Sequence, residues 1–212
     1  MPEAPRLVAN DLSEPEFLSW YGPWDPLSPT EIAELLDGSG VRWWIVGGLA
    51  IDAATGTSRP HDDVDVTLPM RDVAALRAHL PAMHFWEAHS GSLNPLLGDN
   101  PMMPGRQQLW ARRDATEPWI MDLPLSIVEG DEWVFKRDHS IRLPMSRAVV
   151  TAADGLSYMA PQAVLLHKSK QMRDKDRVDF DRTVGGLDAE ARGWLAAAIA
   201  RQHPDHEWLD RL

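Results

Sequence analysis

The sequence predicts an α+β (mixed α/β) fold, in which a small mixed sheet flanked by helices is followed by a helical tail. Three observations predict it. Val41 to Val46 is a continuous apolar run typical of a buried strand, and Val64, Val66 and Leu68 alternate with polar residues. From Pro161 onward, apolar residues recur with a helical period. A mixed body and an all-helical tail follow from these patterns.

The N-terminal region is expected to be an irregular, proline-rich arm over residues 1–29, which contain six prolines. A helix should begin directly after it. Ser28 suits the N-cap, Pro29 suits the first helical position, and Glu31 can reach back to the cap as in a capping box. Gly38 then ends the helix.

The body of the chain, residues 30–150, is expected to mix short helices with short strands. Helices are predicted over 49–55 and 72–80, and strands over 62–68, 85–88, 107–112 and 119–125, the last two paired across a turn. A Gly/Pro/Asn-rich loop is expected over 90–106, and a further hairpin from 133–136 and 140–143. The helical domain, residues 151–212, should hold helices over 161–171, 175–184 and 189–200.

Composition describes a globular protein with one domain, or one domain and a small appendage. The chain has 212 residues, of which 44% are hydrophobic and 25% are charged, so wholesale disorder is excluded. The absence of cysteine excludes disulfides and thiolate metal sites. We find neither a basic-then-apolar leader pattern nor an apolar run near the roughly 20 residues of a bilayer span, and we therefore expect a cytoplasmic protein.

The strongest functional signal is a diglycine, Gly47-Gly48, between the apolar strand and a short helix. Glycines at such a junction let the backbone approach a phosphate, which the N–H groups and the positive end of the helix then face. The next strand carries Asp63 and Asp65. Carboxylates at positions i and i+2 of a strand point the same way, so both can hold the same hard cations.

A third carboxylate is needed to complete a two-metal site and to take a proton from the attacking group. Asp122 is the candidate, because its neighbours Ile120 and Leu123 suit a core strand. A carboxylate without a function would be costly in such a setting.

The segment from Val41 to Leu68 resembles a known family. Its residues GGLAIDAATGTSRPHDDVDVTL are similar to the nucleotidyltransferases that modify aminoglycosides and lincosamides, in particular the aminoglycoside 2''-adenylyltransferases. These are small members of the DNA polymerase beta-like superfamily. A second segment, His167 to Phe180, is similar to a K…R-x-K-D-x-x-D-F pattern in the helical tails of related proteins. The resemblance implies a nucleotidyltransferase domain over residues 30–150 and a C-terminal helical subdomain.

The resemblance also implies roles for individual residues. Gly47 and Gly48 would seat the nucleotide phosphates, and Asp63 and Asp65 would hold two Mg²⁺ ions. Asp122 would hold the catalytic metal and act as the general base. Three basic side chains are the implied contacts to the triphosphate: Lys168, Arg59 and Lys175.

The implied reaction is an in-line attack of an acceptor hydroxyl on the α-phosphorus of ATP, or of another NTP, with release of pyrophosphate. The partners are then the NTP and a small hydroxyl-bearing acceptor, an aminoglycoside or lincosamide, with no membrane partner, and the protein is a monomer or homodimer. The net charge of −11, from 21 basic and 32 acidic residues, fits a polycationic acceptor and argues against binding to a long nucleic acid.

Two other functions stay open from the sequence. Nucleotide transfer to tRNA or to a protein, as in toxin-like relatives, would call for a basic stripe in the RNA case. The only basic cluster, Lys168 to Arg177, is interrupted by Asp174 and Asp176. A non-catalytic nucleotide-binding module is the other alternative, and the retained carboxylates of the motif argue against it.

Several side chains near the motif have a structural interpretation beside the functional one. His61 either touches a phosphate or orients its loop, and Asp52 is expected to have a structural role. Lys168 either contacts phosphate or lies on a solvated helix face. Asp176 and Asp179 are expected to pair with neighbouring cations or to cap the helix rather than to bind metal.

Overall fold

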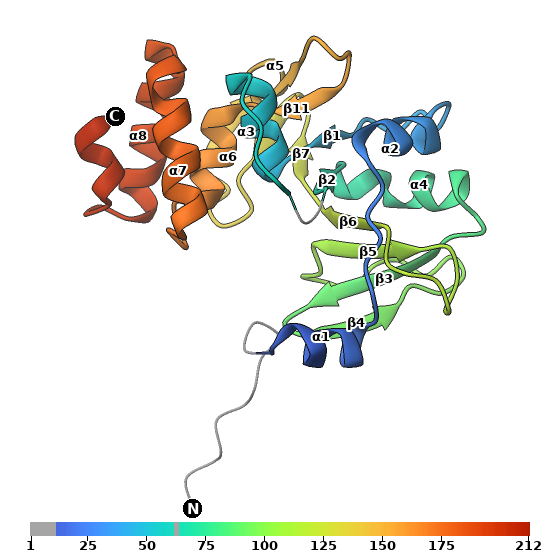
Figure 1. Ribbon diagram of the computed structural model, residues 1–212. Helices are drawn as coiled ribbons and strands as arrows, with labels where there is room; N and C mark the ends of the chain where they lie inside the picture. The colour runs from blue at the N-terminus through green and yellow to red at the C-terminus, as the bar shows by residue number, and fades with distance from the viewer. Residues whose placement is uncertain (1–11, 62–63) are drawn as a thin grey trace, which may run out of the picture. The chain divides into compact units, whose positions relative to one another are not determined.

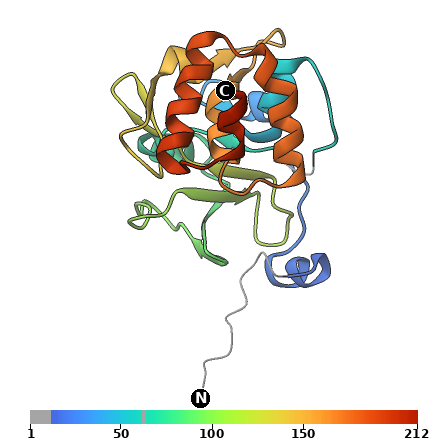
Figure 2. The ribbon, with the colours of Figure 1, turned by 90° about the vertical axis from the view of Figure 1, so that its left-hand side faces the viewer.

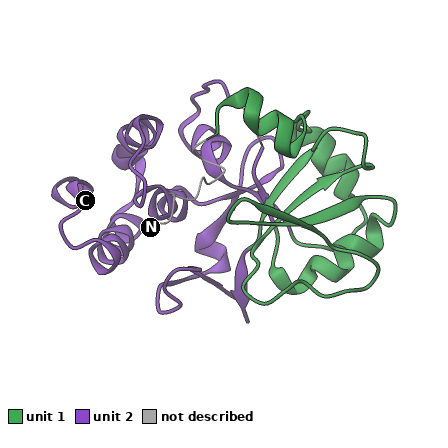
Figure 3. Ribbon diagram, turned by 90° about the horizontal axis from the view of Figure 1, so that it is seen from below, with its two compact units in different colours: residues 1–42, 68–125 green, residues 43–67, 126–212 purple. Residues whose placement is uncertain are grey.

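The computed structural model describes residues 12–61 and 64–212, and the chain divides into two compact units (Figure 3). Unit 1 contains the described residues of 1–42 together with 68–125, and unit 2 contains the described residues of 43–67 together with 126–212. Each unit is therefore built from two separate stretches of chain. This division follows spatial contacts, and the division along the sequence into an arm, a domain over 30–150 and a tail over 151–212 stays a prediction.

Unit 1 is organised around an antiparallel sheet with the strand order β4-β3-β5-β6 (Figure 1). Its strands are β3 (His84–His89), β4 (Ser92–Pro95), β5 (Gln108–Arg112) and β6 (Met121–Pro124). The predicted pairing of residues 107–112 with 119–125 is confirmed, with Trp110 directly opposite Asp122. Strand β4 lies within residues 90–106, which the sequence predicted to be a loop. That part of the prediction is wrong, because β4 pairs with β3 along its length.

Two helices of unit 1 agree with the sequence. Helix α2 (Pro29–Leu36) begins at the predicted capping box, in which the Ser28 N–H donates to the Glu31 carboxylate at 2.8 Å and the Glu31 N–H donates to Ser28 Oγ. Helix α4 (Val73–His79) follows a short 3₁₀ turn, η2 (Met70–Asp72). Both helices turn leucine and isoleucine or valine side chains into the core, as their apolar spacing predicts.

Helix α1 (Glu14–Tyr21) lies within the arm that the sequence predicted to be irregular. A capping box starts it, since the Ser13 N–H donates to the Glu16 carboxylate at 2.8 Å. None of the residues of α1 is buried, so the helix has no continuous apolar stripe from which it could have been predicted. The Tyr21 hydroxyl ties its last turn to the Gly91 carbonyl at 2.7 Å.

The main sheet of unit 2 has the strand order β10-β11-β1-β2. Its strands are β1 (Trp44–Ile45), β2 (Val66–Thr67), β10 (Val149–Thr151) and β11 (Ser157–Met159). Strand β1 runs antiparallel to β2 and parallel to β11, so the sheet is mixed, as predicted. Trp44 and Ile45 are fully buried, which explains the continuous apolar run that predicted this strand.

A second small sheet of unit 2 has the order β7-β8-β9. Its strands are β7 (Ile127–Glu129), β8 (Glu132–Val134) and β9 (Arg142–Pro144), and the short helix α5 (Met145–Ala148) follows. The predicted hairpin is confirmed, because β8 and β9 pair antiparallel with Trp133 opposite Leu143.

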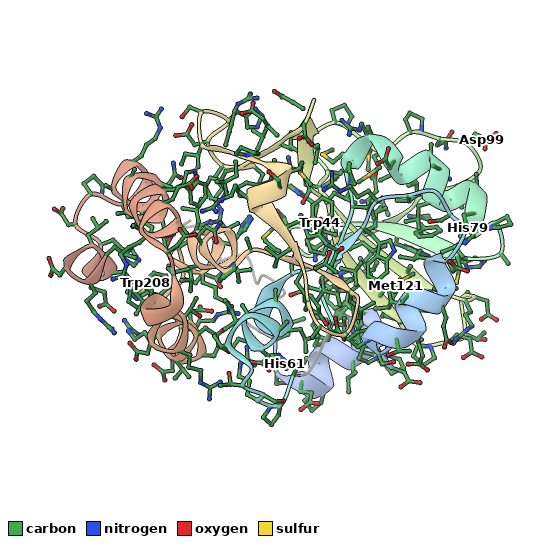
Figure 4. The ribbon with its side chains drawn as sticks, turned by 90° about the horizontal axis from the view of Figure 1, so that it is seen from above. Trp44, His61, His79, Asp99, Met121 and Trp208 are labelled. Atoms are coloured by element: carbon green, nitrogen blue, oxygen red, sulfur yellow. The ribbon has the colours of Figure 1, made fainter. Side chains whose placement is uncertain are left out.

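The predicted helical tail is confirmed, and its helices are seen in Figure 2. They are α6 (Pro161–Lys168), α7 (Asp174–Thr183) and α8 (Ala189–Gln202), with 3₁₀ turns η3 (Val184–Gly186) and η4 (Glu207–Arg211). Trp208 stacks on Phe180 with 4.2 Å between ring centroids, which fastens η4 to α7 (Figure 4). In the part of the chain that the structure describes, no helix is both long and apolar enough to cross a bilayer.

His167 on α6 makes the stability of unit 2 depend on pH. Its ring packs 5.1 Å from that of Phe135 and 5.8 Å from that of Trp133. Burial, assisted by the charges of Lys136 and Arg137, lowers the pKa of His167 to about 3. In the unfolded chain the His167 side chain is protonated as the pH falls through 6.5, whereas in the folded chain it stays neutral until about pH 3. Protonation therefore favours the unfolded state, and the free energy of unfolding decreases as the pH falls below 6.5.

We expect this to cost wild-type protein about 2 kcal/mol of unfolding free energy between pH 7.5 and pH 5. A His167→Gln variant should lose that much less over the same interval, as measured by urea denaturation at both pH values. The exposed His89→Gln change is the matched control and should leave the pH dependence as it is in wild type. Identical pH slopes for wild type and His167→Gln would contradict the assignment.

Candidate functional site

The diglycine lies where β1 gives way to helix α3 (Gly47–Thr55). The Val46 N–H donates to the Asp65 carbonyl at 2.9 Å, which continues the pairing of β1 with β2 beyond the last strand residues. Gly47 has a φ of +70°, in the left-handed region that glycine enters at no steric cost. The helix thus begins two residues earlier than predicted, and both glycines form its first turn, where backbone N–H groups have no partner within the helix.

The Asp65 carboxylate lies directly against Gly47. A Cβ atom at position 47 would be only 2.6 Å from Asp65 Oδ2, closer than real Cβ atoms approach any neighbour. Glycine is therefore required at position 47 for its conformation and also for the room it leaves. The half-buried Asp65 places a negatively charged group next to the positive end of α3.

A second close approach surrounds Gly48. A Cβ atom there would be 2.5 Å from His61 Cε1, 2.8 Å from His61 Nδ1 and in collision with Arg59 Nη2. The loop after α3 thus folds back over the start of the same helix, and Figure 4 shows His61 beside α3 (Figure 4). The diglycine is covered by an imidazole and a guanidinium on one residue and by a carboxylate on the other.

Asp52 holds that loop in place. Its Oδ2 atom accepts the Arg59 backbone N–H at 3.1 Å and lies 2.7 Å from His61 Nε2. Because Asp52 is itself buried in the second turn of α3, these two bonds fix both ends of the segment from Arg59 to His61. The predicted structural role of Asp52 agrees with this geometry.

The remaining predicted carboxylates are Asp63 and Asp122. Asp63 and its neighbour Asp62 lie outside the described residues. Asp122 is on β6 of unit 1, and both of its carboxylate oxygens accept from Gln108 Nε2, at 2.7 and 2.9 Å. Among the residues that the structure describes, no three His, Asp or Glu side chains form a metal-ligand group. The convergence of Asp63, Asp65 and Asp122 therefore stays a prediction.

Gln108 was missed in the sequence, although a signal existed. The two strands that contain Gln108 and Asp122 were predicted to pair, and in an antiparallel pair the residues opposite each other share a face of the sheet. Trp110 lies opposite Asp122, so Gln108, two residues before Trp110, is on the same face as the carboxylate.

The predicted basic residues of the tail differ in their surroundings. Lys168 is buried, with its Nζ 3.0 Å from Asp176 Oδ1 and 2.7 Å from Asp179 Oδ2, so it does not lie on a solvated helix face. Lys175 is exposed in the first turn of α7. The expected pairing of Asp176 and Asp179 with neighbouring cations agrees with these contacts, and the roles of Lys168 and Lys175 toward a nucleotide stay predictions.

Comparison with known proteins finds one similar family over part of the chain and a shared fold over most of it. A family model described as aminoglycoside-2''-adenylyltransferase matches residues 30–92, which include the diglycine and Asp65. The solution structure of the antibiotic-resistance factor ANT(2'')-Ia is similar with a TM-score of 0.55 and 18% identity, covering 86% of this chain and 94% of that one. The fold is that of a nucleotidyltransferase. The predicted resemblance and the predicted fold are thereby confirmed, and the predicted enzyme class, nucleotidyltransferase, stays a proposal.

Two further solved structures share this nucleotidyltransferase fold. ANT(2'')-Ia in complex with adenylyl-2''-tobramycin gives a TM-score of 0.54 at 18% identity, covering 82% of this chain and 95% of that one. The lincomycin-bound lincosamide adenylyltransferase LnuA gives 0.50 at 15% identity, covering 74% and 97%. At these identities the likeness establishes the fold alone. No curated protein matches the sequence.

Proposed function

We propose that this nucleotidyltransferase moves a nucleoside monophosphate, AMP from ATP, to a hydroxyl group of an aminoglycoside, or else of a lincosamide, with Mg²⁺ as its cofactor and pyrophosphate as the second product. The observation that carries the proposal is the Asp65 carboxylate packed against Gly47 in the first turn of α3. Backbone N–H groups and a carboxylate side by side suit a metal-bound triphosphate, since the first bind phosphate oxygens and the second binds the cation.

The residues present fit a magnesium site. Magnesium prefers carboxylate oxygens together with phosphate oxygens and water, and it needs few protein ligands. Asp65, with Asp63 and Asp122, would hold two Mg²⁺ ions. When bound, these ions would neutralise charge on the triphosphate.

Protein groups would carry out the remaining tasks. The N–H groups of Gly47 and Gly48 would bind phosphate oxygens, and Arg59 and Lys175 would add positive charge near them. Lys168 would contribute positive charge from its buried position. Asp122 would take the proton from the acceptor hydroxyl as its oxygen forms a bond to the α-phosphorus and the bond to pyrophosphate breaks. Gln108 would keep the Asp122 carboxylate oriented through its two hydrogen bonds.

The choice of an antibiotic acceptor is supported by the family match over residues 30–92 and by the acidic balance of the chain. A net charge of −11 favours encounter with a polycationic acceptor such as an aminoglycoside. The structural neighbours ANT(2'')-Ia and LnuA were solved with a tobramycin product and with lincomycin, which makes both classes the first acceptors to test.

A transfer assay tests the proposal. The protein is incubated with Mg²⁺ and ATP labelled on the α-phosphate, together with aminoglycosides, lincosamides, tRNA or unrelated proteins in separate reactions. We expect label on an aminoglycoside or lincosamide, with pyrophosphate released in equal amount and no label without Mg²⁺. Label on tRNA or protein would show that the acceptor is a macromolecule and not an antibiotic. Tight ATP binding with no labelled product would favour a non-catalytic module.

Gly47→Ala is expected to lower kcat about 100-fold, because the added methyl group must displace the Asp65 carboxylate and a shift of about 1 Å costs this much. The left-handed backbone at position 47 should add about 1 kcal/mol of destabilisation. Gly56→Ala is the matched control. Gly56 has a φ of +66°, but no described atom lies within 4 Å of the Cβ that alanine would add.

The comparison separates backbone strain from displacement of Asp65. Gly56→Ala should lose a similar amount of stability in urea denaturation and keep its kcat. Equal kcat values for the two variants would mean that the contact between Gly47 and Asp65 has no part in transfer.

A further inference from the structure

A buried cluster of charges in unit 2 connects the helical tail to the loop that covers the diglycine. Asp179 on α7 has no exposed surface, and its carboxylate meets two cations from different elements. Lys168 Nζ of α6 lies 2.7 Å from Asp179 Oδ2. The Arg59 guanidinium faces the same carboxylate, with Nε 3.5 Å from Oδ1 and Nη2 3.5 Å from Oδ2.

The guanidinium of Arg59 lies against both Asp179 and Gly48. Its Nη2 atom faces Asp179, and the same atom occupies the space into which a side chain at Gly48 would project. In a third contact, the other terminal nitrogen of the guanidinium, Nη1, donates to the Pro60 carbonyl at 3.0 Å. Counted among the residues that the structure describes, these three bonds use three of the five guanidinium N–H donors and leave two for an anion above Gly48.

We propose that Asp179 is a positioning residue of the nucleotide site, whose carboxylate, anchored by Lys168, orients the Arg59 guanidinium over Gly48 so that it meets the triphosphate. This inference rests on the proposed function. A planar guanidinium that faces a carboxylate with two donors is fixed in direction as well as in position, which a single contact would not achieve. Orientation before binding lowers the entropy lost when the nucleotide arrives.

The other members of the cluster keep Asp179 in place. Asp176, one turn earlier on α7, is also without exposed surface and shares Lys168 with Asp179, at 3.0 Å. Burial acts to raise the pKa of Asp176, but hydrogen bonds and charge from Arg173 and Lys168 hold it below its ordinary value. Asp176 is therefore ionised at neutral pH and balances the charge of Lys168.

The test measures the affinity for Mg²⁺-ATP by titration calorimetry, together with KM for ATP and kcat. Asp179→Asn should raise both Kd and KM about tenfold, within the range of couplings between residues in one network, and should change kcat less than about threefold. Asp181→Asn is the matched control. Asp181 lies on the same helix, is exposed and pairs with Arg211, and its variant should bind ATP as wild type does.

A double-mutant cycle distinguishes positioning from a general loss of stability. If Asp179 acts through Arg59, then Asp179→Asn should add less than about twofold to the Kd of an Arg59→Ala protein. An unchanged Kd for Asp179→Asn, or an equal increase in both backgrounds, would overturn the inference. If Asp179→Asn does not fold, the same cycle is measured with Asp179→Glu, which keeps the buried negative charge for Lys168 but shifts the carboxylate relative to Arg59.

The outcome for the inference is separate from that for the proposed function. Wild-type protein that binds no Mg²⁺-ATP and transfers no label would refute the proposed function. Wild-type protein that binds and transfers, with a Kd that Asp179→Asn leaves unaltered, would refute the positioning role alone.

Discussion

Asp65→Asn should abolish nucleotidyl transfer, with a loss in kcat of about four orders of magnitude or more. The amide has nearly the size of the carboxylate, so it fits beside Gly47, but it has no negative charge with which to hold Mg²⁺. Metal-ion stabilisation of charge is worth several kcal/mol, and each 1.4 kcal/mol or so is a factor of ten in rate. The measurement is single-turnover transfer from labelled ATP at saturating Mg²⁺.

Asp205→Asn is the control for Asp65→Asn, because Asp205 is an exposed aspartate of the same unit. Both variants should unfold at the wild-type urea concentration, since no packing is lost. Asp63→Asn should match Asp65→Asn in activity. Wild-type turnover by either of these two variants would refute the metal assignment.

Asp122→Asn should lower kcat by about two to four orders of magnitude, the range for removal of a general base. Gln108 Nε2 can still donate to the amide oxygen, so one of its two hydrogen bonds should survive and the fold should be kept. The pH dependence gives the sharper readout. In wild type kcat/KM should rise as the base ionises, and that rise should be absent from the variant.

Asp114→Asn is the control for Asp122→Asn. Asp114 is exposed in the turn between β5 and β6, where it caps Thr116, and its loss should cost stability only. A decrease below about tenfold for Asp122→Asn, or retention of the pH-dependent rise, would assign the proton transfer to another group.

The elements best predicted from the sequence are those with a local cause. The Ser28 and Glu31 capping box sets the start of α2 within four residues, and the fully apolar β1 needs no partner to be recognised. Helix α1 and strand β4 were not predicted, although a capping box of Ser13 and Glu16 also marks the start of α1. The first buries none of its residues, and the second is ordered by pairing with β3 in a segment rich in turn-forming residues.

The candidate site divides in the same way. The diglycine and Asp65 are close in sequence, and the antiparallel pairing of β1 with β2 brings them together, so their neighbourhood was predictable. The partners of Lys168 were harder to foresee, because a lysine at the end of a helix gives no sign of burial until α7 folds against it. The contact of Arg59 with Asp179 joins residues 120 positions apart, and no sequence spacing predicts it.

Strand β1 pairs with two strands that lie at very different distances from it along the sequence. Its neighbour β2 follows about twenty residues later, whereas β11, which pairs with Ile45 through Tyr158, is more than a hundred residues further along. A ribosome must therefore make most of the polypeptide before the strand that precedes the diglycine gains its second neighbouring strand. Pairings this distant in sequence form slowly, so the region around the diglycine should be among the last parts of the nascent chain to fold.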